Sequence, residues 1–504
     1  MKNLIKSIVL LHFLIFVFGQ ETLAQNNKLE EQKTIAALIN QFTNQDAFVS
    51  GEAIAEVVKI GEPSVEQLIK SLSNENETVR WCAAIALGKI APAGQQAIPF
   101  LAAALKDENL NVRWCSAIAL GKFQSLAKSS VTELQNLLND KDEDVRWAAY
   151  TSLCKIDKDA LNKVPKFSDI IEKLETLTPQ LMKELKVPGV SISVIKNNKI
   201  TWSKSYGAAD AEKRTKVSAE TIFEACSMSK PVFAFLVLML VDEGKLDLDK
   251  PLYNYLEEEF VSDEADYSKQ ITARIILSHT SGMPNWRKGD EERGAPIPIY
   301  FKPGTRFNYS GEGIYYLQRV VEHITNEPLE SYAKRNLFDK LDFKSTSFVW
   351  TENLNPQIST GHDTSGNCNK RIKYTHSNAA YTLYTTADEY AKFIIEIMNS
   401  NKSADFSLSQ KMTNEMLTHQ VRVDVRDVTN RPGRYNGLFA YRGLGWAIDS
   451  TITNDVIYHS GANQTGFRCY SQFNIKDLSG IVIMTNGVNG SELWQKLISV
   501  IGDL

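Results

Sequence analysis

The sequence predicts two domains, an all-α solenoid followed by an α+β domain that combines an antiparallel sheet with a helical subdomain. A Val-Arg-Trp tripeptide recurs every 33 residues, at Val79, Val112 and Val145, which is typical of stacked helical repeats. After Pro165, segments that alternate like strands flank a helical middle. At 504 residues the chain also exceeds what one hydrophobic core usually serves.

Residues 1–24 have the pattern of a signal peptide. Lys2 and Lys6 supply positive charge, and residues 8–18 form an apolar run of 11 residues, shorter than the roughly 20 needed to span a bilayer. Small residues up to Ala24 fit a cleavage site before Gln25. We therefore expect an exported protein, periplasmic or secreted, with no stable membrane span after signal cleavage. An N-terminal membrane anchor is the alternative.

Residues 25–162 are expected to form the solenoid. The apolar positions of one copy follow the i, i+3, i+4, i+7 spacing of an amphipathic helix: Val79, Cys82, Ala83, Ala86, Leu87 and Ile90. A second helix of each repeat is marked by Leu68, Leu101 and Leu134, and turn or cap positions by Asn74, Asp107 and Asp140. We expect each repeated Trp to pack between repeats and each repeated Arg to pair with a neighbouring acid.

This pattern resembles HEAT repeats, with residues 35–60 as a degenerate capping unit. Arrays of this kind bury each helix pair against the next pair. The resemblance implies a possible protein partner on the concave face of the solenoid. The net charge of −4 and the lack of a basic tract argue against a nucleic-acid partner.

Residues 163–504 are expected to form the α+β domain. A helix is predicted over residues 168–186, followed by strands over 190–195 and 199–205 that Asn197 and Asn198 join in a hairpin turn. Strands return near the end of the chain, over residues 444–449, 455–459, 469–475 and 481–485. Strands from both ends are expected to share one antiparallel sheet around a helical insert.

The chemistry of this domain is suggested by Ser227 and Lys230, which precede Pro231 and a long apolar run. Residues three apart on a helix lie on the same face, so the amine is placed beside the hydroxyl. A lysine in an apolar pocket can lose its charge and activate a serine. The four-residue pattern alone is weak, because it also occurs at Ser125, Ser152, Ser193 and Ser331.

Two further motifs accompany this pair. Tyr309 follows a loop rich in proline and glycine, which can fix a phenol near the lysine, where it can act as a base. The segment from His459 through Ser460 and Gly461 to Ala462 ends an alternating run. A glycine in a strand lets substrate backbone come close, and backbone N–H groups there could form an oxyanion hole.

Taken in order, these motifs resemble the serine β-lactamase and penicillin-binding-protein superfamily, over roughly residues 168–504. Segments 244–251, 277–282, 302–310 and 443–446 resemble its class C branch, which includes esterases and D-amino-acid peptidases. The resemblance implies that Ser227 is the acylated nucleophile and that Lys230 and Tyr309 share the role of general base. It also implies an oxyanion hole from the amides of Ser227 and Ala462, with His459, Ser460 and Gly461 beside the substrate.

Two departures from the family pattern bear on the substrate. Class C β-lactamases carry an asparagine where this chain has Gly311, and the third motif usually begins with a lysine where this chain has His459. Histidine is mostly neutral at pH 7. Both changes favour an ester or small peptide substrate over a penicillin. Arg468 is a candidate contact for a substrate carboxylate.

We therefore expect an exported serine hydrolase that forms a covalent acyl-Ser227 intermediate, acts on small ester, amide or D-amino-acid peptide substrates, and needs no cofactor or metal. A genuine class C-like β-lactamase is one alternative. The other is a non-catalytic binding or scaffold protein that acts through its HEAT-like solenoid. The presence of Ser227, Lys230 and Tyr309 together favours an enzyme.

Overall fold

The computed structural model describes residues 28–44, 47–138, 140, 142–157, 167–258, 260–262, 267–287, 296–399, 406–423, 440–450 and 455–501. The expected signal peptide, residues 1–24, lies outside this part of the chain. Contacts divide the chain into two compact units, residues 1–164 and 165–504. None of the helices in the described ranges combines the length and hydrophobicity needed to cross a membrane.

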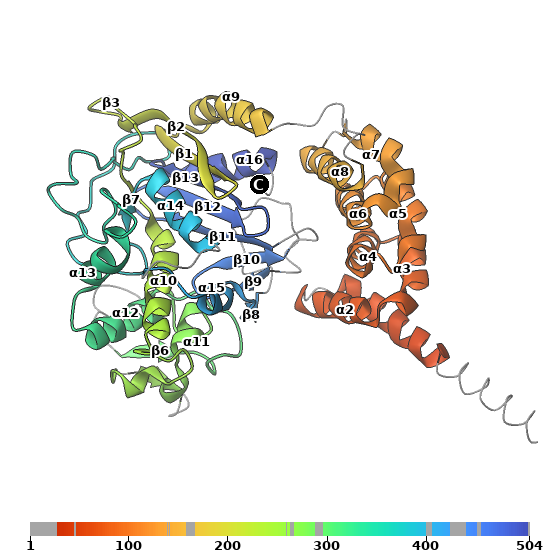
Figure 1. Ribbon diagram of the computed structural model, residues 1–504, viewed down its shortest axis with the longest axis horizontal. Helices are drawn as coiled ribbons and strands as arrows, with labels where there is room; N and C mark the ends of the chain where they lie inside the picture. The colour runs from red at the N-terminus through yellow and green to blue at the C-terminus, as the bar shows by residue number, and fades with distance from the viewer. Residues whose placement is uncertain are drawn as a thin grey trace, which may run out of the picture. The chain divides into compact units, whose positions relative to one another are not determined.

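The first unit is a stack of helix pairs, as the 33-residue period predicts. Residues 28–40 are helical, and the elements that follow are α2 (Ala47–Ile60), α3 (Val65–Ser71), α4 (Glu77–Ile90), α5 (Ile98–Ala104), α6 (Leu110–Lys122), α7 (Val131–Leu137) and α8 (Glu143–Ile156). Each repeat has a short helix and a long one. The short helices α3, α5 and α7 form one layer, and the long helices α4, α6 and α8 form the other (Figure 1).

Buried arginines connect one repeat to the next. The Nε and Nη2 atoms of Arg113 donate to the two carboxylate oxygens of Asp140 at 2.8 and 3.0 Å. Its Nη1 atom donates to the carbonyl oxygens of Asp107 and Glu108, both at 2.9 Å. Arg80 binds Asp107 of the following repeat in the same way. The predicted pairing of each arginine with a neighbouring acid is therefore confirmed for these two.

The turn before each long helix uses two polar residues, where the sequence indicated one. Asp107 accepts from the backbone N–H of Asn109 at 2.9 Å and so forms the turn. The N-cap is Asn109 itself, whose side chain accepts from the N–H of Asn111. In the next repeat, Asp140 forms the turn and Asp142 is the N-cap. Separate turn and cap residues leave the aspartate free to bind arginine.

The second unit is built on one antiparallel sheet. Its strands are β1 (Gly189–Lys196), β2 (Lys199–Asp210), β3 (Thr215–Lys216), β8 (Val421–Arg422), β9 (Ala440–Arg442), β10 (Ala447–Ser450), β11 (Asp455–Ala462), β12 (Arg468–Asn474) and β13 (Ser479–Thr485). Their order is β3-β2-β1-β13-β12-β11-β10-β9-β8. Strand β1 pairs with β13, so the two ends of the domain meet in mid-sheet, as predicted.

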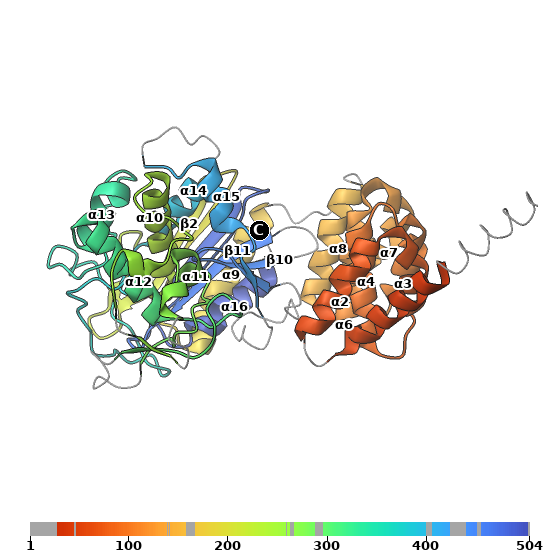
Figure 2. The ribbon, with the colours of Figure 1, turned by 90° about the horizontal axis from the view of Figure 1, so that it is seen from below.

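Helices cover both faces of the sheet. On one face lie α9 (Phe167–Leu185) and α16 (Gly490–Ile501), and on the other α10 (Ser229–Asp242), α14 (Ala387–Met398) and α15 (Gln410–Leu417) (Figure 2). The remaining elements are α11 (Ala273–Leu277), α12 (Gly311–Thr325), α13 (Leu329–Ala333), and the strand pairs β4 (Phe223–Glu224) with β7 (Tyr384–Thr385) and β5 (Phe260–Ser262) with β6 (Ile297–Ile299). This layout is the predicted α+β arrangement.

One strand begins later than the sequence suggests. The apolar run from Leu444 was expected to be extended throughout, but β10 begins at Ala447. Gly445 has a φ of +82°, and a Cβ atom there would lie 2.5 Å from the Cβ of Ala234 on α10. The chain therefore turns at the glycine, where it approaches the helix too closely for a side chain.

Helix α10 is the centre of the hydrophobic core. Its residues from Ser229 to Leu240 are buried, and all but Ser229 and Lys230 are apolar. A helix that is apolar on all sides is stable only when it is enclosed by other elements. The core therefore fixes the position of the charged residue in its first turn.

We expect the Arg113→Ala variant to be strongly destabilised, because it removes the guanidinium that pairs with the buried carboxylate of Asp140. Breaking a buried pair costs about 3–5 kcal/mol. Lys70→Ala is the matched control, because its ion pair with Glu66 is exposed and such pairs contribute about 0–1 kcal/mol. Urea unfolding of the whole chain measures both, and equal losses of unfolding free energy would contradict a structural role for the buried pair.

Candidate active site

Ser227 lies in a tight turn that opens the buried helix α10. Cys226, Ser227 and Met228 form one 3₁₀ turn. Cys226 has a φ of +55°, a left-handed conformation that is uncommon outside glycine. The thiol of Cys226 donates to the carbonyl oxygen of Glu224 at 3.2 Å. The turn is therefore held in an unusual shape, with Ser227 partly exposed above the enclosed helix.

The amine of Lys230 lies beside the hydroxyl of Ser227. Its Nζ atom is 3.2 Å from the Oγ atom of Ser227 and donates to the carbonyl oxygen of Ala380 at 2.7 Å. The side chain is only 1% exposed. The same Nζ atom lies 4.7 Å from the centre of the Tyr309 ring. The structure thus brings Ser227, Lys230 and Tyr309 together, as the sequence motifs predict.

His279 holds the segment that carries Tyr309. Its Nδ1 atom accepts a hydrogen bond from the backbone N–H of Ser310, and its carbonyl oxygen accepts one from the N–H of Asn308 at 2.7 Å. The rings of His279 and Tyr309 are 4.4 Å apart. The residue before and the residue after Tyr309 are therefore both bonded to one histidine, which limits how far the phenol can move.

Sequence reasoning gave His279 no role, although the segment 277–282 was recognised as part of the family pattern. Burial holds the pKa of His279 well below its usual range, and the charges of Arg442 and Lys230 lower it further. The imidazole is therefore neutral at neutral pH. A neutral ring keeps the lone pair on Nδ1 that the N–H of Ser310 requires.

His459 faces the same centre from β11. Its ring lies 6.5 Å from that of Tyr309, and its Nδ1 atom donates to the carbonyl oxygen of Ser460 at 2.8 Å. Burial, followed by the charges of Lys230 and Arg442, holds the pKa of His459 well below its usual range. The third motif therefore presents a neutral imidazole with an unpaired, buried Nε2 atom.

Gly461 allows β11 to pack against the turn formed by Cys226, Ser227 and Met228, the nucleophile turn. A Cβ atom at this position would lie 2.2 Å from the carbonyl oxygen of Ala225 and 3.0 Å from the Cβ of Cys226. Only glycine permits this approach. It places Ala462, the next residue, at the exposed end of the strand next to the turn that contains Ser227. The oxyanion hole from the amides of these two residues stays a prediction.

Arg468 makes other contacts than the one expected of it. Its Nη1 atom donates to the carbonyl oxygens of Asn463 and Phe467 at 2.6 and 2.7 Å. The guanidinium therefore closes the turn between β11 and β12. Both contacts use the Nη1 atom, and the contact of Arg468 with a substrate carboxylate stays a prediction.

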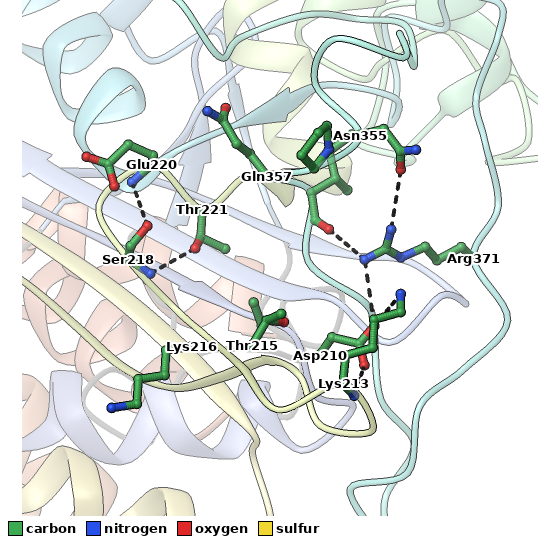
Figure 3. A pocket seen from close by; sticks show the side chains of 13 residues that line it. Asp210, Lys213, Thr215, Lys216, Ser218, Glu220, Thr221, Asn355, Gln357 and Arg371 are labelled. Carbon is green, nitrogen blue, oxygen red and sulfur yellow. Dashed lines mark hydrogen bonds and ion pairs between the residues drawn. The ribbon is translucent and has the colours of Figure 1, made fainter.

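A separate pocket of about 420 Å³ lies between β2, β3 and the segment around Asn355, and Ser227 does not line it. Figure 3 shows the guanidinium of Arg371 directed at the side chain of Asn355 in the wall of this pocket. Arg371 also donates to the carbonyl oxygen of Ile358, and Asp210 is paired with Lys213. The carboxylate of Asp210 is thus engaged by two cations of the pocket wall, Lys213 and Arg371. Among the described residues, no cluster of three His, Cys, Asp or Glu side chains could hold a metal ion.

Comparison with known proteins agrees with this geometry. The β-lactamase family model matches residues 174–502, well over half of the chain. The HEAT repeat model matches three overlapping segments, residues 35–109, 65–154 and 103–169. The β-lactamase match thus falls on the unit that contains the sheet, and the HEAT matches fall mainly on the helical unit.

Individual relatives lie in the same region. Protein flp of Staphylococcus aureus is 24% identical over 348 residues, which are 66% of this chain and 65% of that protein. Esterase EstB of Burkholderia gladioli is 29% identical over 210 residues, or 37% of this chain and 53% of that protein. The chain thus spans under two thirds of the length of these curated relatives.

Among solved structures, the penicillin-binding protein homologue from Pyrococcus abyssi superposes with a TM-score of 0.56 at 22% identity, covering 66% of this chain and 78% of that one. This likeness concerns the fold alone. Together with the family match, the antiparallel sheet and the assembled Ser227 centre lead to one conclusion: the chain belongs to the β-lactamase family of hydrolases and carries HEAT repeats ahead of that domain.

Proposed function

We propose that the protein is a serine hydrolase that transfers acyl groups through a covalent acyl-Ser227 intermediate. The observation that carries this proposal is the contact of 3.2 Å between the Nζ atom of Lys230 and the Oγ atom of Ser227. An amine that is buried and aligned by the carbonyl of Ala380 is well placed to take the hydroxyl proton. Positioned proton transfer of this kind typically contributes about 10²–10⁴-fold in rate.

The reaction would run in two halves. In the first, the amine form of Lys230 takes the proton of Ser227 while Oγ bonds to the carbonyl carbon of the substrate. The resulting oxyanion would accept hydrogen bonds from the N–H groups of Ser227 and Ala462. The bond to the leaving alcohol or amine then breaks, and the leaving group takes the proton back through Tyr309. In the second half, Tyr309 passes its own proton to Lys230 and takes one from a water molecule, whose oxygen attacks the acyl carbon. The bond between Oγ and the acyl carbon then breaks, and Ser227 regains a proton from Lys230.

Esters and small D-amino-acid peptides are the favoured substrates. The position of Gly311 has no amide side chain, and a Cβ there would lie 2.6 Å from the indole of Trp286. The neutral His459 offers no fixed charge for a carboxylate. Both features count against a genuine β-lactamase. The relative EstB bears the name of an esterase, which supports the ester reading for this chain.

We further propose that the chain is exported and that the solenoid binds a protein partner. The charged and apolar pattern of residues 1–24 supports export, and a mature N-terminus at Gln25 is the observation that tests it. The repeats support a partner surface because stacked helix pairs form extended faces. A pure scaffold is less favoured, since such a protein has no need for a lysine buried against a serine.

Glu224 supports the oxyanion side of the site. Its Oε2 atom accepts from the Nδ2 of Asn463 at 2.9 Å and from the hydroxyl of Thr465 at 2.6 Å. Its backbone carbonyl accepts from the thiol of Cys226, next to the nucleophile. The residue therefore ties the turn after Ala462 to the turn that carries Ser227. Burial raises the pKa of Glu224 from its usual 4.5 to about 7.

We expect Ser227→Ala to abolish hydrolysis of a chromogenic short-chain ester, with a loss on the order of a thousandfold or more, as for other nucleophile deletions. Labelling by a phosphonate probe, followed by intact mass, should disappear in the same variant. Ser331→Ala is the matched control, because Ser331 and Lys334 repeat the pattern on an exposed surface. Undiminished labelling of Ser227→Ala would refute the assignment. A chromogenic cephalosporin in the same assay separates an esterase from a β-lactamase.

A variant lacking residues 25–162 should retain ester hydrolysis, because the two units each have their own internal contacts. The value of kcat/KM should stay close to that of the full chain. Circular dichroism and the melting transition establish that the shortened chain is folded. Lost activity in a folded product would show that the solenoid completes the active site.

The free energy of unfolding should fall as the pH rises from 4.5 to 7, because the folded state binds the proton of Glu224 more tightly than the unfolded state does. Stability from this group is complete below pH 4.5 and is lost as the pH passes 7. Glu224→Gln should remove up to about 3 kcal/mol of this dependence.

Chemical unfolding between pH 5 and pH 8 measures the pH effect at Glu224. Glu66→Gln is the control, because Glu66 is exposed and its pKa is lowered by Lys70, so it should follow the wild type over this range. Curves for wild type and Glu224→Gln that stay parallel would contradict the raised pKa.

A further inference from the structure

An exposed tryptophan lies beside the candidate centre. Trp286 is 41% exposed. Its indole covers Gly311, which follows Tyr309 by two residues. Trp286 therefore lies against the residue two positions after Tyr309, whose ring is close to the amine of Lys230.

A second aromatic ring continues this surface. The ring of Tyr381 meets Trp286 edge-to-face, with centroids 5.5 Å apart and planes at 90°. Tyr381 directly follows Ala380, whose carbonyl oxygen binds Lys230. The ring of Tyr374 extends the row at 5.3 Å from Tyr381. The rings of Trp286, Tyr381 and Tyr374 thus form one row, and Tyr381 is next in sequence to the residue whose carbonyl oxygen binds Lys230.

The loop that carries Trp286 is held rigidly. The carbonyl oxygen of Asn285 accepts from the N–H groups of Gly311 and Glu312, both at 3.0 Å. The guanidinium of Arg287 donates to both carboxylate oxygens of Glu312 at 3.2 Å, and that carboxylate also accepts from the backbone N–H of Arg287. Residues on both sides of Trp286 are therefore fixed to the start of α12. A rigid aromatic surface loses little conformational entropy when it binds.

The glycine opposite the indole belongs to the same arrangement. A Cβ atom at Gly311 would lie 2.6 and 2.7 Å from two ring carbons of Trp286, and 2.8 Å from the carbonyl oxygen of Asn285. Any larger residue would push the indole away. Gly311 therefore leaves space for the indole ring of Trp286 and has no polar side chain that could bind a substrate.

From these observations we infer that Trp286 and Tyr381 form a substrate subsite for an aromatic or other flat apolar group. The subsite rests on the proposed hydrolysis at Ser227, and it narrows the substrate class to esters or amides that carry such a group. The group binds through contact with the ring faces and edges. It belongs either to the acyl part or to the leaving alcohol of the substrate, and matched esters distinguish the two.

The test compares three esters without a chromogenic leaving group, with acid release followed by a pH indicator. Ethyl butyrate is the reference, ethyl 3-phenylpropanoate places the ring on the acyl part, and 2-phenylethyl butyrate places it on the alcohol. Wild type should prefer one aromatic ester over the reference by about tenfold or more in kcat/KM, a typical discrimination for apolar pockets. The preferred ester identifies the side of the scissile bond that the subsite serves.

Substitution of the tryptophan should remove this preference. The ratio of kcat/KM for the preferred aromatic ester to that for ethyl butyrate should fall about tenfold in Trp286→Ala and much less in Trp286→Phe, which keeps a flat ring. Trp202→Ala is the matched control, because Trp202 is half-buried on β2 and interacts with Glu175. Its ratio should equal that of wild type.

Two failures are distinguishable. In the first, all three esters are hydrolysed in a reaction that depends on Ser227, but wild type shows no aromatic preference, or the ratio is unchanged in Trp286→Ala. This result overturns the subsite and leaves the proposed hydrolase function intact. If wild type hydrolyses none of the esters, the proposed ester hydrolysis fails, and binding decides the subsite. Calorimetric titration of Ser227→Ala with both aromatic esters should then show saturable binding of one of them that is lost in the double variant with Trp286→Ala. Equal binding, or none, overturns the subsite.

Discussion

The buried amine of Lys230 is the constraint on which the catalytic unit depends. A lysine that is 1% exposed inside an apolar helix requires hydrogen-bond partners, because an unpaired buried polar group costs several kcal/mol. Its partners are the hydroxyl of Ser227 and the carbonyl oxygen of Ala380, which is 150 residues away in the chain. The need to satisfy one amine thus brings the nucleophile turn and the 377–382 segment to the same point, with the ring of Tyr309 beside them.

In the solenoid, the cost of burying a charged side chain is offset by an ion pair. Arg113 and Asp140 are both largely buried, and each oxygen of the carboxylate receives a donor from the guanidinium. The remaining nitrogen of Arg113 closes the turn before its own helix. A planar, bidentate pair repeated at each step gives a fixed spacing between repeats. In the catalytic unit, by contrast, the amine of Lys230 binds a hydroxyl and a carbonyl oxygen and has no carboxylate partner among the described residues, which suits a group that must exchange a proton.

Close approaches of backbone shape the catalytic centre as much as charged groups do. Gly461 lets β11 lie against the nucleophile turn, and Gly311 leaves space for the indole of Trp286. His279 fixes the Tyr309 segment through one ring nitrogen and one carbonyl oxygen. Such contacts fix the geometry that proximity effects in catalysis require. They also explain why a single Gly311→Asn change cannot create the amide contact of a class C β-lactamase: its Cβ would collide with the indole.

The sequence alone determined the two-domain division into repeats and sheet, the pairing of repeat arginines with acids, and the grouping of Ser227, Lys230, Tyr309 and His459. Local periodicity carries the repeats and the Ser227–Lys230 pair, because helix and strand spacing place residues on faces without reference to distant segments. The resemblance of the ordered motifs to the β-lactamase superfamily placed Tyr309 and His459 beside that pair. The roles of His279 and Trp286 emerged only from the tertiary structure. Both act through segments that are brought to Tyr309 or Gly311 across about thirty residues of chain, and no spacing rule in the sequence encodes a contact between loops.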